Sequence, residues 1–184
     1  EEIPGGPVDR GHGRGGMENR VIWLRALSFV LAVQVTVVAV IPWLLRHVGP
    51  RDDLGTWRAV GLIPLVLGVA LLIVCNVLFV RQGRGTAAPY DPPRALVIQG
   101  PYRYLRNPMY VSAHLIVVGL SLWLGAVTVL GYAVVLGVAY HVFVRYYEEP
   151  RLTAMFGEPY EEYLRTVPRW SPRRCQGVRR RVNR

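Results

Sequence analysis

Apolar residues along this chain come in long runs that short polar segments separate. Arg25 is the only charged residue between positions 21 and 45, and positions 59–80 contain no charged residue. A helix needs roughly 20 apolar residues to span the ~30 Å hydrocarbon core of a bilayer. We therefore predict that each of these two runs forms one transmembrane helix.

A third apolar run covers positions 109–144 and contains no acidic residue and no arginine. Its 36 residues are too many for one span, and Gly119, Gly125 and Gly131 lie near its middle. We predict two helices here, over 109–124 and 126–145, joined by a very tight turn near 124–126. With spans over about 21–45 and 59–80, the fold class is all-α, an integral membrane bundle of about four transmembrane helices.

The polar segments complete this prediction. Glycines and prolines in 81–94 disfavour a regular helix, and the apolar residues 95–98 suit a short β or re-entrant piece of a cytoplasmic loop. After position 150 apolar residues recur at helical spacing, and Gly157 and Pro159 divide them into two amphipathic surface helices over about 150–167. The apolar residues of this stripe are Leu152, Phe156, Tyr160, Tyr163, Leu164 and Val167.

We expect three regions along the chain: a flexible N-terminal segment over 1–20, a membrane domain over 21–172 and a basic tail over 173–184. All 22 basic residues are arginines. With four spans, the N-terminal segment, the 81–108 loop and the C-terminal part share one side and hold 18 arginines, against 3 on the other side. The positive-inside rule then places both termini in the cytoplasm and the protein in a plasma or bacterial inner membrane.

This distribution of charge also bears on partners. The arginines follow the loops and no nucleic-acid-reading module is present, so we expect contact with membrane lipids and not with nucleic acid. Cys75 lies in a predicted span and Cys175 in the basic tail, so the two thiols are not expected to meet. Without a C-x-x-C spacing or paired histidine ligands, we expect no metal site.

The densest polar stretch is Gly100-Pro-Tyr-Arg-Tyr-Leu-Arg-Asn-Pro-Met-Tyr110, directly before the predicted hairpin, and Glu148-Glu149 follow directly after it. Polar groups at the mouth of a membrane segment are costly, which points to a bound ligand. Simpler roles exist for each residue. The arginines can reach lipid headgroups, the tyrosines can form an interfacial belt, and Asn107 can cap a helix that starts at Pro108. Arg145 can pair with Glu148 and Glu149 on a helix surface.

Several motifs resemble one family. Gly83-Arg-Gly-Thr86, Asp91-Pro-Pro93, Gly100-Pro-Tyr102 with Arg106-Asn-Pro-x-Tyr110, and Glu148-Glu-Pro-x-Leu152 are similar to membrane-embedded methyltransferases related to isoprenylcysteine carboxyl methyltransferase. Phospholipid N-methyltransferases form a neighbouring branch. Phe156-Gly157, Tyr160, Tyr163 and Val167-Pro168 continue the likeness, which covers roughly residues 83–172.

The resemblance implies S-adenosylmethionine as methyl donor and a lipophilic acceptor, either an isoprenylcysteine carboxylate or a phospholipid amine. It implies catalytic roles for Arg106, Arg145 and Glu149, with Arg145 one position from the family's acceptor-binding arginine. Asn107 replaces the family's histidine and cannot titrate near neutral pH. The cofactor-binding residues that the resemblance implies are Leu96, Val97, Tyr102, Asn107, Pro108, Tyr110 and Glu148.

The chemistry of methyl transfer suits these residue types. Displacement at a sulfonium requires mainly that donor and nucleophile be aligned, aromatic faces tolerate the positive sulfur, and carboxylates hold the donor's ammonium and ribose. Two alternatives stay open from the sequence. One is an NADPH-dependent membrane isoprenoid or steroid reductase, and the other is a non-catalytic membrane protein whose charges only set topology.

Overall fold

The computed structural model describes residues 24, 28, 30–50, 55–83 and 95–171, and every regular element among them is helical. The predicted N-terminal segment, the basic tail with Cys175, and the motif residues 84–86 and 91–93 lie outside this part. The first described helix ends with α2 (Ile41–Leu45) after two π-helical turns, Val30–Gln34 and Thr36–Val40. The longer helices are α3 (Leu62–Leu78), α4 (Pro108–Leu124) and α5 (Val127–Phe143).

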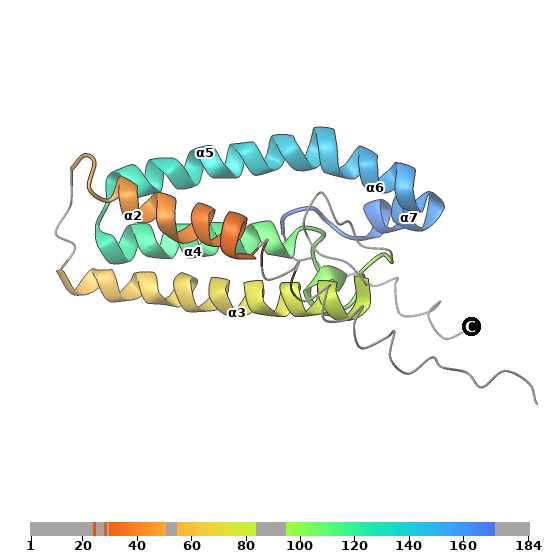
Figure 1. The fold of residues 1–184 in the computed structure, drawn as a ribbon, viewed down its shortest axis with the longest axis horizontal. Coiled ribbons are helices and arrows are strands. Elements are labelled where there is room, and N and C mark those ends of the chain that lie inside the picture. Colours follow the sequence, from red (N-terminus) through yellow and green to blue (C-terminus); the bar gives the residue numbers. More distant parts are fainter. Residues whose placement is uncertain (1–23, 25–27, 29, 51–54, 84–94, 172–184) are drawn as a thin grey trace, which may run out of the picture.

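These helices run side by side as an elongated bundle, with α4 between α3 and α5 (Figure 1). Two helices, Gly55–Gln82 and Val127–Phe156, are long and apolar enough to cross a membrane, while Ala32–Leu45 and Pro108–Leu124 are shorter apolar helices. The all-helical, apolar architecture agrees with the prediction, and the number of four spans stays a prediction. Large apolar side chains such as Val66 and Val135, each more than half exposed, point away from the bundle.

The α3–α4 contact is unusually close because glycines face it from both helices. A Cβ atom added at Gly68 would lie 2.8 Å from the Ser112 carbonyl oxygen, and one added at Gly119 would lie 2.6 Å from the Leu65 backbone nitrogen. Small residues let helix backbones approach in this way inside membranes. The two helices therefore form a rigid unit on which the rest of the bundle is placed.

The first helix joins this unit through polar contacts inside the bundle. Gln34, which is almost fully buried, accepts a hydrogen bond of 3.1 Å from the Asn76 side chain on α3. On α5, Tyr132 donates to the Val37 carbonyl at 3.0 Å and Thr128 donates to the Leu45 carbonyl at 2.9 Å. Side-chain hydrogen bonds of this kind stabilise helix association in membranes.

The tight turn between α4 and α5 lies where the sequence predicts it. Gly125 adopts the left-handed conformation (φ 60°, ψ 33°) directly after Leu124, and Ala126 then begins the next helix. A left-handed glycine ends a helix at little conformational cost, so two residues suffice to reverse the chain. The predicted hairpin is confirmed.

Beyond α5 the chain stays helical for longer than the predicted end at 145. A π-helical turn, Val144–Glu148, leads without interruption into α6 (Glu149–Phe156), so Pro150 lies inside one continuous helix, directly after the π-helical turn. Gly157 (φ 61°) then ends α6, and α7 (Glu158–Thr166) follows. The predicted division into two short helices at Gly157 is confirmed.

The stripe of apolar residues on α6 and α7 packs inward, over the segment before the polar motif. Tyr160, Tyr163 and Val167 are buried, with Leu96 and Ile98 packed against them. The described residues 95–98 form no strand; they run as irregular chain held by these side-chain contacts. The prediction of a β piece is wrong, because apolar packing against α7 replaces backbone pairing here. The re-entrant alternative stays a prediction.

Candidate functional site

The polar motif forms a short turn and then the first residues of α4. Gly100 has a positive φ of 58° and opens a 3₁₀ turn, Gly100–Arg103, and Pro108 occupies the first turn of α4. The Arg106 backbone amide donates to the Pro168 carbonyl oxygen at 2.9 Å. The Tyr163 hydroxyl donates to the Tyr102 carbonyl oxygen at 2.7 Å. The segment after α7 is therefore tied directly to the motif.

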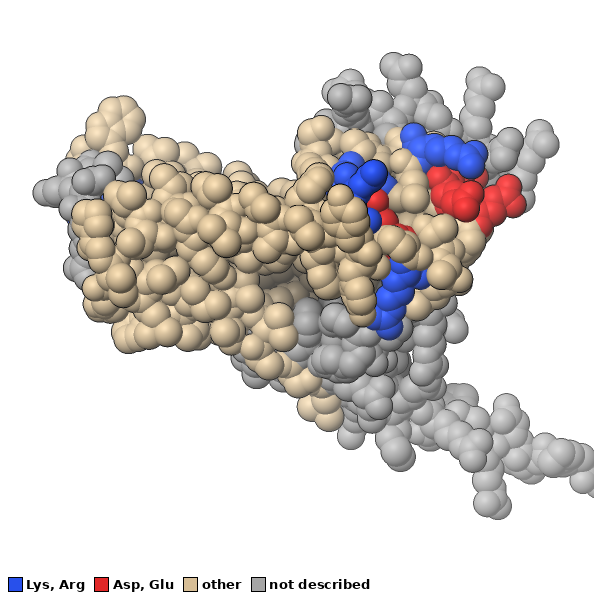
Figure 2. Space-filling view, turned by 90° about the horizontal axis from the view of Figure 1, so that it is seen from above, with Lys and Arg blue, Asp and Glu red and all other residues tan. Residues whose placement is uncertain are grey.

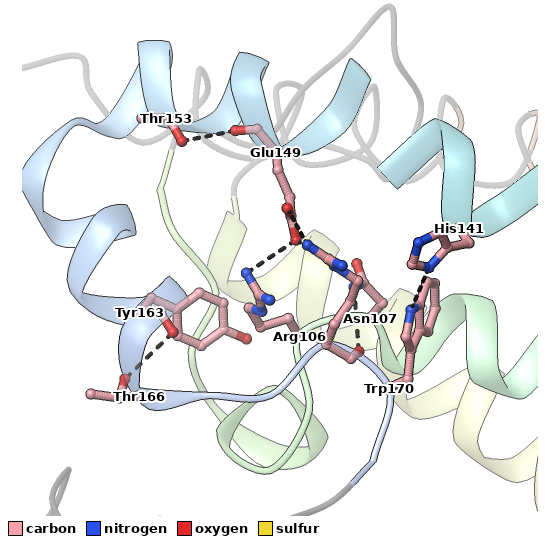
Figure 3. Close-up of polar contacts among 9 residues, drawn as sticks. Arg106, Asn107, His141, Glu149, Thr153, Tyr163, Thr166 and Trp170 are labelled. Atoms are coloured by element: carbon pink, nitrogen blue, oxygen red, sulfur yellow. Dashed lines mark hydrogen bonds and ion pairs between the residues drawn. The ribbon is translucent and has the colours of Figure 1, made fainter. Parts of the chain in front are cut away.

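Glu149 is the centre of the strongest polar contacts. It is 9% exposed, and Arg106 approaches its Oε1 atom to 3.0 Å. Arg169 donates to both oxygens, from Nε to Oε1 at 2.8 Å and from Nη2 to Oε2 at 2.7 Å, so the contact is bidentate (Figure 3). Paired guanidinium groups satisfy a buried carboxylate that would otherwise be costly. Glu149 thereby joins three segments, namely the polar motif, α6 and the chain after α7.

Glu148 has a different environment from its neighbour. Its Oε2 atom accepts a hydrogen bond of 2.6 Å from the Tyr110 hydroxyl, which comes from the first turn of α4. The Tyr110 ring packs against Tyr140 at 4.7 Å between centroids and against Phe143 at 6.5 Å. No described residue bonds the second oxygen of Glu148. One carboxylate of the pair is thus locked between arginines, while the other keeps an oxygen for a ligand.

Arg169 is the site residue that the sequence analysis missed. The hydrogen bonds that Arg169 donates to Glu149 raise the pKa of the Arg169 guanidinium above its usual value, so it stays charged. The adjacent Trp170 donates from its indole nitrogen to Nδ1 of His141 at 3.2 Å (Figure 3). A cue was present in the sequence, since an arginine and a tryptophan directly follow the Val167-Pro168 motif.

Two predicted cofactor-binding residues, Leu96 and Val97, precede the motif in sequence and pack on opposite sides of the chain. Leu96 packs with the α6–α7 stripe, whereas Val97 is buried against Cys75 and Tyr102. Burial raises the pKa of the Tyr102 phenol well above its usual range, so this group is neutral. The Tyr102 ring contacts Phe79 edge-on, at 5.5 Å between centroids. Leu96, Val97 and Tyr102 thus hold the chain around the start of the motif in place through packing contacts.

Two expectations about individual residues are wrong. Asn107 is the N-cap residue of α4, but its side chain makes no capping hydrogen bond; instead Nδ2 donates to the Arg169 carbonyl oxygen at 3.4 Å. The side chain is turned toward the returning chain, and its oxygen accepts no hydrogen bond from the first turn of α4. Arg145 makes no ion pair with any described residue: its side chain is exposed on the π-helical turn, while Glu149 faces inward to Arg106.

The structure thus brings together Arg106, Asn107, Tyr110, Glu148 and Glu149, and leaves Arg145 outside this group. On the face drawn in Figure 2, the described charged side chains gather at the end that carries α6 and α7, and the described remainder is uncharged. Beside Tyr110, a cavity of about 330 Å³ lies between α4 and α5. Among the described residues no group of His, Cys, Asp and Glu is arranged to hold a metal ion.

Comparison with known proteins gives one match. A family model described as phospholipid methyltransferase matches residues 57–159, more than half of the chain. The matched range contains the polar motif and both carboxylates, and it ends before Arg169. No curated protein and no solved structure matches the chain significantly. The match confirms the resemblance to integral membrane methyltransferases that the motifs predict.

Proposed function

The chain belongs to the phospholipid methyltransferase family and is thereby a membrane methyltransferase acting on lipid, and on this premise we propose that it uses S-adenosylmethionine as donor. The observation that carries the proposal is the meeting of two motifs about forty residues apart. Tyr110 bonds Glu148 while Arg106 pairs with Glu149, so both motifs face one place at the end of the bundle.

The residues present fit the chemistry of this donor. The oxygen of Glu148 that no described residue bonds can accept a hydrogen bond from an ammonium group. The Nε atom of Arg106 is buried and has no described hydrogen-bond partner, so it can donate to a carboxylate. The rings of Tyr110 and Tyr140 offer faces to a positive sulfur. S-adenosylmethionine, when bound, supplies a methyl group on such a sulfur.

We propose that the other predicted residues shape the donor site at the end of the bundle. Asn107 and Pro108 start α4 and thereby aim Tyr110, while Leu96, Val97 and Tyr102 fix the motif against α3 and α7. Glu149 and Arg106 hold the segments together, and Arg106 also contacts the donor. Arg145 is exposed at the same end and does not line the cavity beside Tyr110, so we assign it to a negatively charged part of the acceptor, such as a phosphate. The protein's contribution to rate is alignment of donor and acceptor, which requires segments held as firmly as these.

For the acceptor we favour a lipid amine over a carboxylate. Among the residues that the structure describes, the walls of the cavity beside Tyr110 include aromatic rings and no arginine. Aromatic faces attract a cation such as a methylated ammonium, whereas a carboxylate acceptor needs a positive partner. In the reaction the headgroup ammonium would first lose a proton to water, and the freed amine nitrogen would then attack the methyl carbon. The carbon–sulfur bond would break to leave a neutral thioether, and the positive charge would pass from the sulfur to the nitrogen.

The runner-up is the NADPH-dependent reductase, and the third reading is a non-catalytic membrane protein. The family match favours methyl transfer over both. We further propose that both termini are cytoplasmic, in a plasma or bacterial inner membrane, which the arginine distribution supports. This orientation places the site at the face from which a water-soluble donor enters.

The test uses detergent-purified full chain, S-adenosylmethionine labelled in its methyl group, and a total membrane lipid extract. We expect label in an organic-soluble product that chromatography identifies as a methylated lipid amine. Glu148→Ala removes the carboxylate and should abolish transfer, whereas Glu162→Ala, at an exposed position on α7, should leave it unchanged. Label in a methyl ester would favour the carboxylate acceptor, and NADPH binding without donor binding would favour the reductase.

A further inference from the structure

The cavity between α4 and α5 includes residues that the proposed donor site does not use, among them His114, Gly137 and Trp170. Its volume of about 330 Å³ is at the low end for ligand pockets, which run from about 300 to 1,000 Å³. Residues from both helices and from the chain after α7 form its wall. They are Tyr110, Val111, His114, Leu115, Gly137, Tyr140, His141 and Trp170.

The cavity and the polar site share one side chain. Tyr110 contributes to the cavity wall and also donates its hydroxyl hydrogen to Glu148. Next to it, Trp170 reaches across from the segment after α7 and bonds His141 on α5 (Figure 3). A ligand in the cavity would therefore lie beside the carboxylate that we assign to the donor.

His114 stands in the cavity wall one helical turn beyond Tyr110. Its Nδ1 atom is buried and has no described hydrogen-bond partner, and no described residue bonds Nε2. The imidazole packs on the bare backbone of Gly137, since a Cβ atom added there would lie 3.1 Å from Cε1 of His114. The ring is thus fixed by its packing, and Nε2 is the nitrogen able to bind a ligand.

We propose that this cavity receives the headgroup end of the lipid acceptor, with Nε2 of His114 bonding a headgroup oxygen as a positioning contact. The inference rests on the proposed methyl transfer and names where its acceptor lies. The face of Trp170, which the donor does not use, attracts the positive charge of the headgroup, and the absence of a side chain at Gly137 keeps the cavity open. His114 acts on the acceptor's affinity and position, not on the displacement itself.

Gly137→Leu tests the cavity, with Gly131→Leu as matched control. Both positions lie on α5, but a Cβ atom at Gly131 has no atom within 4 Å, so the control adds a side chain to open space. The probes are phosphatidylethanolamine in detergent micelles and S-adenosylmethionine, each measured by equilibrium binding to the full chain. We expect Gly137→Leu to weaken binding of the lipid about tenfold and to leave donor binding within about twofold.

His114→Leu and His114→Gln test the positioning contact separately. Glutamine carries an amide nitrogen close to the place of Nε2, while leucine fills the space without a polar atom. We expect KM for phosphatidylethanolamine to rise about tenfold in His114→Leu with kcat little changed, and His114→Gln to recover most of the loss. Equal KM values in the two variants and the natural chain would overturn the role of His114.

Measuring lipid binding and methyl transfer separately distinguishes failure of this inference from failure of the proposed function. If the natural chain transfers no methyl group to any lipid, the proposed function falls, while lipid binding still decides whether the cavity is occupied. Unchanged lipid binding in Gly137→Leu would overturn the cavity assignment even with methyl transfer intact. Parallel loss of donor and lipid binding in a folded Gly137→Leu protein would also overturn it, since one shared site would then explain both.

Discussion

The two faces of α4 differ in how closely their neighbours approach. Against α3, glycines bring the backbones so close that an added Cβ at Gly68 or Gly119 would lie within 3 Å of backbone atoms. Against α5, the helices separate toward their polar end and leave a cavity of about 330 Å³. The close face fixes where Tyr110 points, and the open face has room for a ligand. A membrane enzyme needs both, because alignment requires rigidity and entry from the bilayer requires space.

Gly68→Leu should have the largest effect, because it forces a side chain into the close face. Overpacking costs typically about 1–3 kcal/mol even for small additions, and here backbone atoms would have to move. We expect loss of the monodisperse folded protein in size-exclusion chromatography. Gly131→Leu, which points to open space, should elute and unfold like the natural chain. A normal thermal unfolding curve for Gly68→Leu would show that the α3–α4 contact is looser than we describe.

Arg169→Ala should have the next largest effect, at the polar end. It leaves Glu149, 9% exposed, with Arg106 as its remaining ion-pair partner among the described residues. Removing one partner of a buried ion pair costs about 3–5 kcal/mol, and the second arginine reduces this cost. We expect a lower unfolding temperature and faster hydrogen exchange in residues 167–171.

The matched control is Arg165→Ala. Its partner is Glu161 at 3.6 Å, and the two side chains are 77% and 48% exposed. Exposed pairs of this kind contribute roughly 0–1 kcal/mol, so the unfolding temperature should barely change. If both arginine variants behave alike, the contacts of Glu149 do not hold the returning segment in place.

Trp170→Phe should have the smallest effect, and it sharpens the description of the open face. The substitution keeps a ring in the cavity wall but removes the indole hydrogen bond to His141. A hydrogen bond of this kind contributes about 0.5–1.5 kcal/mol, so KM for the lipid should rise by a few fold at most. Trp170→Ala should raise KM further, and the kinetics of the two variants measure how much of the effect belongs to the ring.

The repeating pattern of apolar residues predicted much of the fold, because burial in a bundle depends on local spacing. The hairpin at Gly125 and the inward stripe ending at Val167 were both readable from the sequence. The continuation of the helix from Val127 to Phe156 was not, since Pro150 predicts a break, whereas the helix continues through it directly after a π-helical turn.

The polar contacts were predicted less well than the helices, and the reason is physical. Glu148 and Glu149 are adjacent and chemically alike, so the sequence does not say which one meets the arginines. That choice depends on the π-helical turn before them and on the path of the chain after α7, which brings Arg169 back to Glu149. Arg145 lies about one helical turn before both carboxylates in sequence, but spacing alone does not carry it to the inward side.

The most direct test of the central claim is equilibrium binding of S-adenosylmethionine to the purified full chain, compared between Glu148→Gln and Glu162→Gln. Glu148→Gln keeps the shape of the side chain and removes its charge beside Tyr110. We predict that it weakens donor binding at least about tenfold while Glu162→Gln binds like the natural chain. Equal donor binding in folded Glu148→Gln protein would contradict the claim that the two motifs meet to form the donor site.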